Sequence, residues 1–317
     1  MVRYLIIGSL GQDGVLLRNL LEENNCEVFG VTRPKVGLAS HFDSNLRTYY
    51  APFWEKDIAL GILRSLRPDV VLHLAAVHGP SGSNTMYSSP ELKLMAHRVQ
   101  VQITENVISY LGTESRESQL ILAGSSKMYS GLVGSSKVNE QTVICPIDYY
   151  GELKAMSHLL IENARNAGLR TATAIMFNHE SALRRKGFLF RDIAREIARV
   201  LQNKNSQLEL RNANALGDWH SASDTVRGLY LMSLQEHTQD YIFASGVQQS
   251  INEIMTKYFW EFHKMDLPNV VSSNQQQQNS SLIGDNSLAK EYLGWKPLKP
   301  VIYDLHDIVL QEQISLR

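Results

Sequence analysis

The sequence predicts an α/β protein built on a doubly wound parallel sheet, and three observations lead to this fold class. Short apolar runs alternate along the chain with longer segments in which apolar residues have helical spacing. The runs are apolar at consecutive positions, which is typical of strands buried on both faces. The first run ends in a glycine-rich turn that opens a helix. Such an alternation places a ligand crevice at the carboxyl ends of the strands.

The expected elements follow in order along the chain. Strands are expected at residues 3–8, 26–32, 70–76, 119–124, 171–177 and 241–245. Helices are expected at residues 13–24, 58–66, 96–111, 150–167 and 188–201. From about residue 179 the alternation loosens, so we expect two units. The larger comprises residues 1–178 with about 240–246, and a smaller C-terminal α/β lobe comprises residues 179–239 and 247–317.

The composition is that of an ordinary globular chain and excludes several classes of function. Of 317 residues, 44% are hydrophobic and 20% are charged, and the net charge of -1 argues against broad binding to nucleic acid or to an anionic membrane. No apolar run approaches the ~20 residues of a membrane span, and no secretory signal is expected. Cys26 and Cys145 stand far apart, so we expect reduced thiols, no metal site and a cytoplasmic protein.

The turn from Gly8 to Gly14 carries the strongest functional signal. Glycines at positions 8, 11 and 14 let the backbone turn tightly and approach a pyrophosphate, which would lie on the N-terminus of the following helix. Leu10, Gln12 and Asp13 complete this turn. A tight strand-to-helix turn without a ligand would also explain the glycines, but the turn is the first such junction of the chain and matching chemistry lies downstream.

That chemistry is carried by Tyr150 and Lys154, which stand four residues apart at the start of a predicted helix. Both side chains therefore leave the same face. A tyrosine hydroxyl has a pKa of about 10, so acid–base work near pH 7 requires a nearby cation that lowers it. Lys154 at ~4 Å would supply about 4 kcal/mol. The alternative is an incidental surface pair.

Ser125 follows the apolar strand that ends at Gly124, and hence lies at the carboxyl edge of the sheet. Its hydroxyl could bind the oxygen that Tyr150 protonates or deprotonates. The alternative is a serine that caps a turn or helix.

In these residues, the chain resembles the extended short-chain dehydrogenase/reductase family and, within it, the GDP-mannose 4,6-dehydratase group. The similarity covers nearly the whole chain. It is carried by residues 8–14, 74–76, 123–126, 150–154, 177–181, 218–219, 224 and 293–297.

The resemblance implies a Rossmann domain that binds NADP(H) and a C-terminal lobe that binds a nucleotide sugar, with Ser125, Tyr150 and Lys154 acting at sugar carbon C4. Residues expected at the cofactor are Gly8, Leu10, Gly11, Gln12, Asp13, Gly14, Arg33, Leu74, Ala75, Ala76, Tyr150, Lys154, His179 and Arg184. Residues expected at the substrate are Asn178, Glu180, Ser181, Arg185 and Arg211; the basic cluster 184–186 could equally be solvated surface.

The end of the second strand bears on the choice of cofactor. An aspartate or glutamate there would bind the 2′-hydroxyl of NAD, but Thr32, Arg33 and Lys35 occupy this position. Basic residues suit the 2′-phosphate of NADP. A solvated basic turn is the alternative, so NAD stays possible.

Lys127 is the main departure from the group. The dehydratases place a glutamate two residues after the catalytic threonine or serine, and there it removes the C5 proton and protonates the departing C6 hydroxyl. A lysine with a pKa of about 10.4 is a poor base at pH 7. We therefore expect 4-keto reduction or epimerisation at C4. The alternatives are a 4,6-dehydratase with Asp148 or Glu152 as substitute base, and a paralogue that binds cofactor without catalysis; Lys127 could also form a structural ion pair.

Two further departures concern the substrate and the assembly. Gly217 stands where the group usually has arginine, and residues 274–281, a polar stretch expected to form an exposed loop, lack the expected Arg-Pro pair, which puts GDP-mannose itself in doubt. Residues 33–37 match the interface loop of the group only in part. We expect a homodimer through helices that include 150–167, or a homotetramer.

Overall fold

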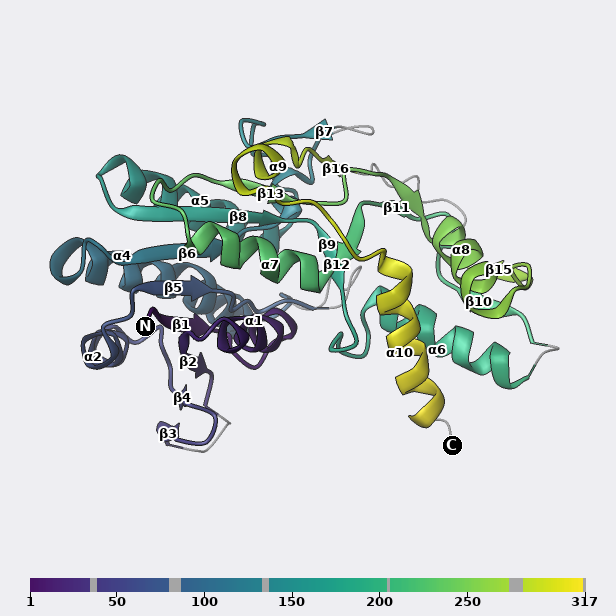
Figure 1. The fold of residues 1–317 in the computed structure, drawn as a ribbon, viewed down its shortest axis with the longest axis horizontal. Helices are drawn as coiled ribbons and strands as arrows, with labels where there is room; N and C mark the ends of the chain where they lie inside the picture. Colours follow the sequence, from purple (N-terminus) through teal and green to yellow (C-terminus); the bar gives the residue numbers. More distant parts are fainter. Residues whose placement is uncertain (35–38, 80–86, 133–136, 204–205, 274–281, 316–317) are drawn as a thin grey trace.

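The structure is a computed structural model that describes residues 1–34, 39–79, 87–132, 137–203, 206–273 and 282–315 (Figure 1). Three sequence predictions fall outside these ranges. They concern Lys35 in the basic turn, residues 36–37 of the expected interface loop, and the polar stretch 274–281.

A mostly parallel sheet forms the centre of the molecule. Within the described ranges it has eight strands in the order β13-β8-β6-β5-β1-β2-β4-β3, and only β3 and β4 run antiparallel. From one edge to the other, these strands are β13 (Tyr241–Phe243), β8 (Arg170–Met176), β6 (Gln119–Ala123), β5 (Val70–His73), β1 (Arg3–Ile7), β2 (Glu27–Thr32), β4 (Thr48–Tyr50) and β3 (His41–Asp43). The chain leaves β1 in one direction through β2 and returns to its other side with β5, which confirms the doubly wound topology.

The two faces of the sheet are covered by different helices, because successive strand residues point to opposite faces. Leu5 and Val71 face the core under α2 (Lys56–Leu66), α4 (Ile103–Glu114) and α5 (Tyr149–Asn166). Tyr4 and Leu72 face the other core, which α1 (Gln12–Glu23), α7 (Ala222–Ser233) and α9 (Ser287–Leu293) cover. Figure 1 shows α7 lying across the sheet.

The segment expected as one helix at residues 96–111 is divided. The structure has α3 (Pro90–His97), a widened π-helical turn η1 (Arg98–Gln102) and then α4. The widened turn frees the Gln100 carbonyl oxygen, which accepts hydrogen bonds from Thr104 Oγ1 at 2.8 Å and from Ser157 Oγ of α5 at 2.9 Å. The break therefore joins α4 to α5.

The C-terminal part packs around a core of its own. Its helices are α6 (Leu189–Gln202), α8 (Ile251–His263) and α10 (Val301–Ser315), and Figure 1 shows them beyond the end of the sheet. Short strand pairs accompany them: β9 (Asn178–Glu180) with β12 (Trp219–Ser221), β10 (Leu208–Leu210) with β15 (Val270–Ser272), and β11 (Leu216–Gly217) with β14 (Gln249–Ser250). A further pair, β7 (Lys137–Val138) with β16 (Ile283–Gly284), and the one-turn helix η2 (Ser126–Tyr129) lie nearer the sheet.

The packing refines the expected division of the chain. Residues 179–239 and 247–317 were assigned to the C-terminal lobe, but Leu229 of α7 and Leu293 and Trp295 at the end of α9 pack in the core of the sheet. These helices are therefore part of the larger unit. Among the described residues, no helix is long and apolar enough to cross a membrane.

Candidate active site at the carboxyl ends of the strands

The glycine turn between β1 and α1 has the geometry that the sequence predicts. Gly8 has a φ of +92°, and a Cβ atom there would lie 2.8 Å from the backbone nitrogen of Ala75. A Cβ atom at Gly14 would overlap the Gly8 carbonyl oxygen and lie 2.7 Å from Cα of Ser9. Both positions therefore require glycine.

The N-terminus of α1 is open to an anion. Gly11 is the N-cap of this helix and has no side chain with which to cap the first N–H groups. Leu74, Ala75 and Ala76 follow β5 directly beside the turn, where the Leu74 N–H donates to the Ile7 carbonyl at 2.9 Å. Leu10 is 46% exposed next to them. The uncapped backbone N–H groups and the helix dipole thus fit a pyrophosphate at this point.

Asp13 and His179 tie this turn to β9. His179 Nε2 lies 3.2 Å from Asp13 Oδ2, and His179 Nδ1 lies 2.7 Å from the Phe177 carbonyl oxygen. Because both ring nitrogens face acceptors, the charged form of the ring can donate through both of them. Burial opposes this charge, but the Asp13 carboxylate outweighs burial and raises the pKa of His179. Burial likewise opposes ionisation of Asp13, but His179 and Arg184 lower its pKa to about 2.

Glu180 at the end of β9, and Ser181 and Arg184 after it, also bind other residues of the protein. Ser181 Oγ donates to Gln12 Oε1 at 2.9 Å, and the Arg184 guanidinium pairs with buried Glu180 at 2.6 Å and donates to the His179 carbonyl. The structure thus brings Gln12, Asp13, His179 and Arg184 together. The ring nitrogens of His179 and the guanidinium of Arg184 thus bind other residues of the protein. The resemblance implies instead that both residues reach the cofactor.

Ser125, Tyr150 and Lys154 meet at the carboxyl end of β6, as predicted. The Ser125 side chain adjoins the Tyr150 phenol and acts to lower its pKa, and the Ser125 hydroxyl accepts the Lys127 N–H at 3.2 Å, so the capping alternative is realised as well. Lys154 is 3% exposed; its Nζ donates to the Ala123 carbonyl at 2.6 Å and lies 5.7 Å from the centre of the Tyr150 ring.

The charges at this cluster differ from the expectation. Burial is the main cause that raises the pKa of Tyr150 above its ordinary value, and it outweighs the opposing bond to Ser125. Burial also lowers the pKa of Lys154 to about 8, against the attraction of Asp13. The sequence analysis expected Lys154 to lower the pKa of Tyr150; in this arrangement the ammonium is directed at Ala123, and burial decides the pKa of the phenol.

Lys127 forms the ion pair that the sequence analysis named as an alternative. Its Nζ lies 3.7 Å from Oδ2 of Asp148, and both side chains are about half exposed. Asp148 Oδ1 accepts the Gly151 N–H at 2.8 Å and so caps α5. Asp148 therefore has two partners, whereas Glu152 is exposed in the first turn of that helix.

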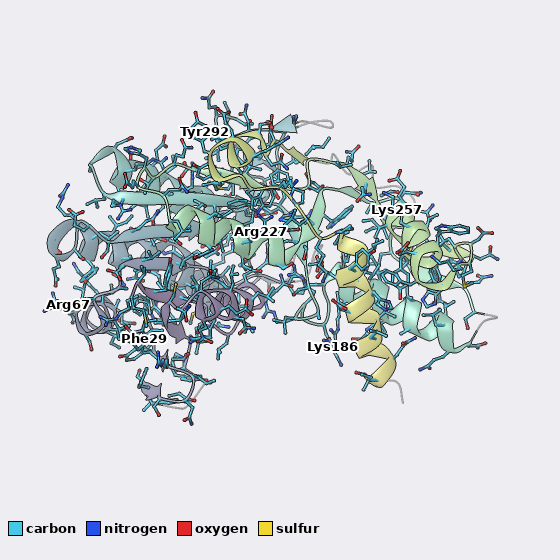
Figure 2. All side chains as sticks on the ribbon, viewed as in Figure 1. Phe29, Arg67, Lys186, Arg227, Lys257 and Tyr292 are labelled. Atoms are coloured by element: carbon cyan, nitrogen blue, oxygen red, sulfur yellow. The ribbon has the colours of Figure 1, made fainter. Side chains whose placement is uncertain are left out.

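The remaining substrate candidates lie toward the C-terminal part. Asn178 is exposed on β9, Arg185 lies with its guanidinium 5.6 Å from the centre of the Phe188 ring, and Arg211 is exposed just after β10. Arg33 is exposed at the end of β2. Figure 2 shows Lys186, the next basic residue after Arg185, on the side where the sheet approaches α10.

The glycine at position 217 has a packing reason. A Cβ atom there would lie 2.6 Å from Cζ2 of Trp219. An arginine at this position would require Trp219 to move, so the loss of the expected arginine and the placement of this indole go together.

One neighbour of Tyr150 was not assigned a role by the sequence analysis. The ring of His78 lies 4.4 Å from that of Tyr150, centre to centre, and 5.6 Å from that of Phe188. His78 lacks the spacing of a metal-ligating motif, so no motif singles it out. Its position, two residues after Ala76 at the carboxyl end of β5, was the available signal.

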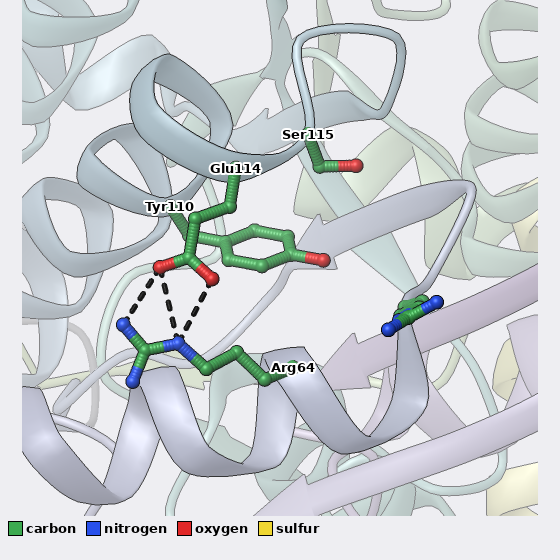
Figure 3. Close-up of a pocket in the computed structure, with 5 residues that line it drawn as sticks. Arg64, Tyr110, Glu114 and Ser115 are labelled. Atoms are coloured by element: carbon green, nitrogen blue, oxygen red, sulfur yellow. Dashed lines mark hydrogen bonds and ion pairs between the residues drawn. The ribbon is translucent and has the colours of Figure 1, made fainter.

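A separate cavity of about 260 Å³ lies at the opposite edge of the sheet, between the C-terminal ends of α2 and α4 (Figure 3). Arg64 and Glu114 form a bidentate ion pair at its wall, with a shortest distance of 2.7 Å. Arg67 precedes β5 and Ser115 precedes β6, so this cavity lies at the amino ends of the strands, away from the glycine turn.

A doubly wound sheet with a glycine-rich first turn and a Ser–Tyr–Lys cluster at the carboxyl ends of its strands defines an extended short-chain dehydrogenase/reductase. The model of the family described as GDP-mannose 4,6 dehydratase matches residues 5–301, and the chain belongs to this family. The resemblance inferred from the sequence is thereby confirmed, and with it an enzyme class that modifies nucleotide sugars.

A curated relative agrees with this assignment, and solved structures share the fold. A GDP-mannose 4,6-dehydratase from Vibrio cholerae serotype O1 is 27% identical over 353 residues, covering 98% of this chain and 91% of that protein. RMD from Pseudomonas aeruginosa, solved with NADPH, is 20% identical with a TM-score of 0.78, covering 99% of each chain. A UDP-glucose 4-epimerase from Stenotrophomonas maltophila, solved with NAD and a formylated UDP-arabinopyranose, is 17% identical with a TM-score of 0.79, covering 100% of this chain and 99% of that one.

Proposed function

We propose that this protein is an NADP(H)-dependent enzyme that acts on a nucleotide-activated hexose by redox chemistry at sugar carbon C4. The observation that carries this proposal is the cluster of Ser125, Tyr150 and Lys154 beside the glycine turn. When bound, the nicotinamide supplies or accepts the hydride at C4. Ser125 binds the C4 oxygen, and Tyr150 gives or takes the proton of that oxygen. The Lys154 ammonium binds ribose hydroxyls and supplies positive charge at the site.

The direction of reduction suits the protonation of Tyr150. Because its pKa is raised, the phenol carries its proton near pH 7, and that form donates to a ketone oxygen. In the reduction, the proton of Tyr150 passes to the oxygen of the C4 ketone while C4 receives the hydride. The product is a C4 alcohol, and the tyrosinate regains its proton from solvent.

The glycine turn is the proposed cofactor site. The N-terminus of α1, which no side chain caps, would hold the pyrophosphate, and the close backbone packing at Gly8 and Gly14 shapes the turn that presents it. Exposed Arg33 at the end of β2 favours the 2′-phosphate of NADP over NAD. RMD from Pseudomonas aeruginosa was solved with NADPH, which supports that choice, and NAD stays the alternative.

Lys127 decides between reduction or epimerisation and dehydration. Elimination across C5 and C6 needs a base for the C5 proton, and the position that resembles the glutamate of the dehydratases holds a lysine paired with Asp148. Family membership nevertheless supports one second candidate, a 4,6-dehydratase that uses Asp148 or Glu152 as its base. Asp148 would first have to leave Lys127 and the cap of α5.

The test is a cofactor titration followed by turnover. NADPH and NADP⁺ are titrated by fluorescence, and the loaded enzyme is then given GDP-mannose or its 4-keto-6-deoxy derivative. We expect NADPH oxidation with the keto sugar alone. Formation of the keto sugar from GDP-mannose without net change in NADPH would establish the dehydratase. Tight cofactor binding with no turnover of these or other nucleotide sugars would leave a non-catalytic paralogue.

We also propose a homodimer formed through the outer face of α5. Met156 and Leu159, which lie on this helix, are 45% and 49% exposed, unlike the buried residues of its inner face. Replacing Leu159 by Lys should halve the mass that light scattering measures, with NADPH binding retained. Tyr292→Lys is the control and should keep the dimer, because Tyr292 is 57% exposed on α9, which covers the other face of the sheet.

A further inference from the structure

Three aromatic rings from separate parts of the chain, those of Tyr150, His78 and Phe188, pack in a row of tilted rings at the candidate site, which we call the stack. Tyr150 comes from the first turn of α5, His78 from the segment after β5, and Phe188 from the residue before α6. The ring centres of His78 and Tyr150 are 4.4 Å apart with 30° between the planes, and those of His78 and Phe188 are 5.6 Å apart with 57° between them. His78 is thus the middle member, in contact with both lobes.

Cations lie at both ends of this stack. The Arg184 guanidinium lies 5.1 Å from the centre of the Phe188 ring, and Lys154 Nζ lies 5.7 Å from that of Tyr150. Burial is the main cause that lowers the pKa of His78, to about 4, and the charges of Lys154, Arg184 and Lys127 act in the same direction. Asp148 opposes them. His78 is therefore a neutral ring at any pH at which the enzyme would work, and a poor carrier of protons.

We propose that His78 is a positioning residue, whose ring holds the Tyr150 ring in the orientation that points its hydroxyl at Ser125 and shields it from water, with Phe188 holding His78 in turn. This inference rests on the acid–base role proposed above for Tyr150. A tyrosine side chain reaches its target through two rotatable bonds, so its oxygen moves when the ring tilts. A misplacement of about 1 Å at a reacting group can cost about 100-fold in rate.

The stack also makes the orientation of Tyr150 depend on the C-terminal lobe. Phe188 is 9% exposed and precedes α6, whose inner face is buried in the lobe core. The same ring lies under the guanidinium groups of Arg184 and Arg185. A substrate that contacts these arginines would therefore change the packing of the stack and, through it, the orientation of Tyr150.

The experiment compares two substitutions of His78. His78→Phe keeps an aromatic ring and removes the nitrogens, whereas His78→Ala removes the ring. We expect His78→Ala to lower kcat by about 10-fold to 100-fold with KM changed less than about twofold, and His78→Phe to keep most of kcat with the same pH profile. His41→Ala is the matched control. His41 lies on β3, away from the site, and its ring stacks on that of Tyr50 with 4.6 Å between the ring centres and 4° between the planes.

A second readout does not require turnover. With ¹³Cζ-labelled tyrosine, the Tyr150 resonance is assigned by its loss in Tyr150→Phe, and its titration is followed by NMR. The raised pKa of Tyr150 should fall toward 10 in His78→Ala, because water reaches the phenol, and should stay raised in His78→Phe.

Two outcomes would overturn the proposal. If His78→Ala changed neither kcat nor the titration of Tyr150, the stack would have no positioning role. If His78→Phe lost as much activity as His78→Ala together with one limb of the pH profile, His78 would be a proton carrier. Should Tyr150→Phe keep full turnover, the proposed function would fail, and the NMR titration would still decide whether His78 shields Tyr150.

Discussion

The glycine turn and the basic segment around Arg185 adjoin each other through His179 and Arg184, yet they are built by different means. In the turn, backbone contacts leave no room for side chains at Gly8 and Gly14. Arg185 is exposed, and its guanidinium packs against a single ring, that of Phe188. The first region thus admits very few residues at its key positions. The second can change its side chains without disturbing the fold, which is how members of one family can keep a cofactor site and differ in substrate.

Removing the hydroxyl of Tyr150 should have the largest effect, since the phenol joins the two regions. We expect Tyr150→Phe to lower kcat by about 100-fold to 10,000-fold, because general acid–base catalysis contributes that much. The adjacent Tyr149→Phe is the control, because its hydroxyl only donates to the Lys93 carbonyl at 3.3 Å. Steady-state assays with NADPH and the keto sugar measure both. Equal activity of the two variants would contradict the role of Tyr150.

The steric constraint at the turn is tested by Gly14→Ala. The added Cβ would overlap the Gly8 carbonyl oxygen, so we expect a loss of about 1–3 kcal/mol in the free energy of unfolding, together with weaker NADPH binding. Gly61→Ala in α2 is the control: a Cβ atom there meets no atom within 4 Å, and the change should stabilise the helix by up to about 1 kcal/mol. Urea unfolding measures both changes. A Gly14→Ala variant as stable as the parent would show that the turn can relax.

The pair between Asp13 and His179 should make stability depend on pH in two ranges. The pKa of Asp13 is lowered to about 2 from 3.8, so its contribution of about 2 kcal/mol is present above pH 4 and lost as pH falls toward 2. The pKa of His179 is raised, so its contribution is present below pH 6.5 and lost as pH rises through the folded-state value. Asp13→Asn should flatten both ranges in urea unfolding measured from pH 2 to 9. An unchanged profile would rule out this pair as the source.

The smallest effect is expected on the exposed side. Arg185→Ala should raise KM for the nucleotide sugar by about fivefold, because a single exposed charge contributes about 1 kcal/mol, and should leave NADPH affinity unchanged. Arg195→Ala, at a guanidinium 3.4 Å from Asp192 in α6, is the control and should change neither quantity. An effect of Arg185→Ala on NADPH alone would move Arg185 to the cofactor side.

Much of the fold could be predicted because buried parallel strands are written as short apolar runs. β1 and β6 begin where the sequence predicts and end within one residue of the expected positions. The hairpin of β3 and β4 escaped prediction because its strands are three residues long with few apolar positions. The division of residues 96–111 also escaped, because a π-helical turn keeps the apolar spacing nearly intact. Residues 222–233, which the sequence analysis expects in the C-terminal lobe without predicting a helix there, form α7 and pack on the sheet, because the sequence pattern does not show what covers a buried face.

At the candidate site, the sequence could predict which residues gather but not where their groups point. Ser125, Tyr150 and Lys154 are brought together because strand ends of a parallel sheet share one edge. That Lys154 donates to Ala123, or that Lys127 meets Asp148, depends on rotamers that no spacing encodes. His78 was missed for the same reason: its partner Tyr150 is more than seventy positions away, and only packing brings the two tilted rings into contact.

The tie between Asp13 and His179 spans 166 positions of the chain. During synthesis, the ribosome releases the glycine turn long before it adds the residues that fasten it, and Ser181, which binds Gln12, comes later still. The nascent N-terminal segment therefore contains the glycine turn without its bonds to His179 and Ser181 until more than half of the chain has been synthesised. A fragment that ends before residue 178 would keep the glycines and lose these contacts, so the glycine turn acquires its bonds to His179 and Ser181 only at a late stage of synthesis.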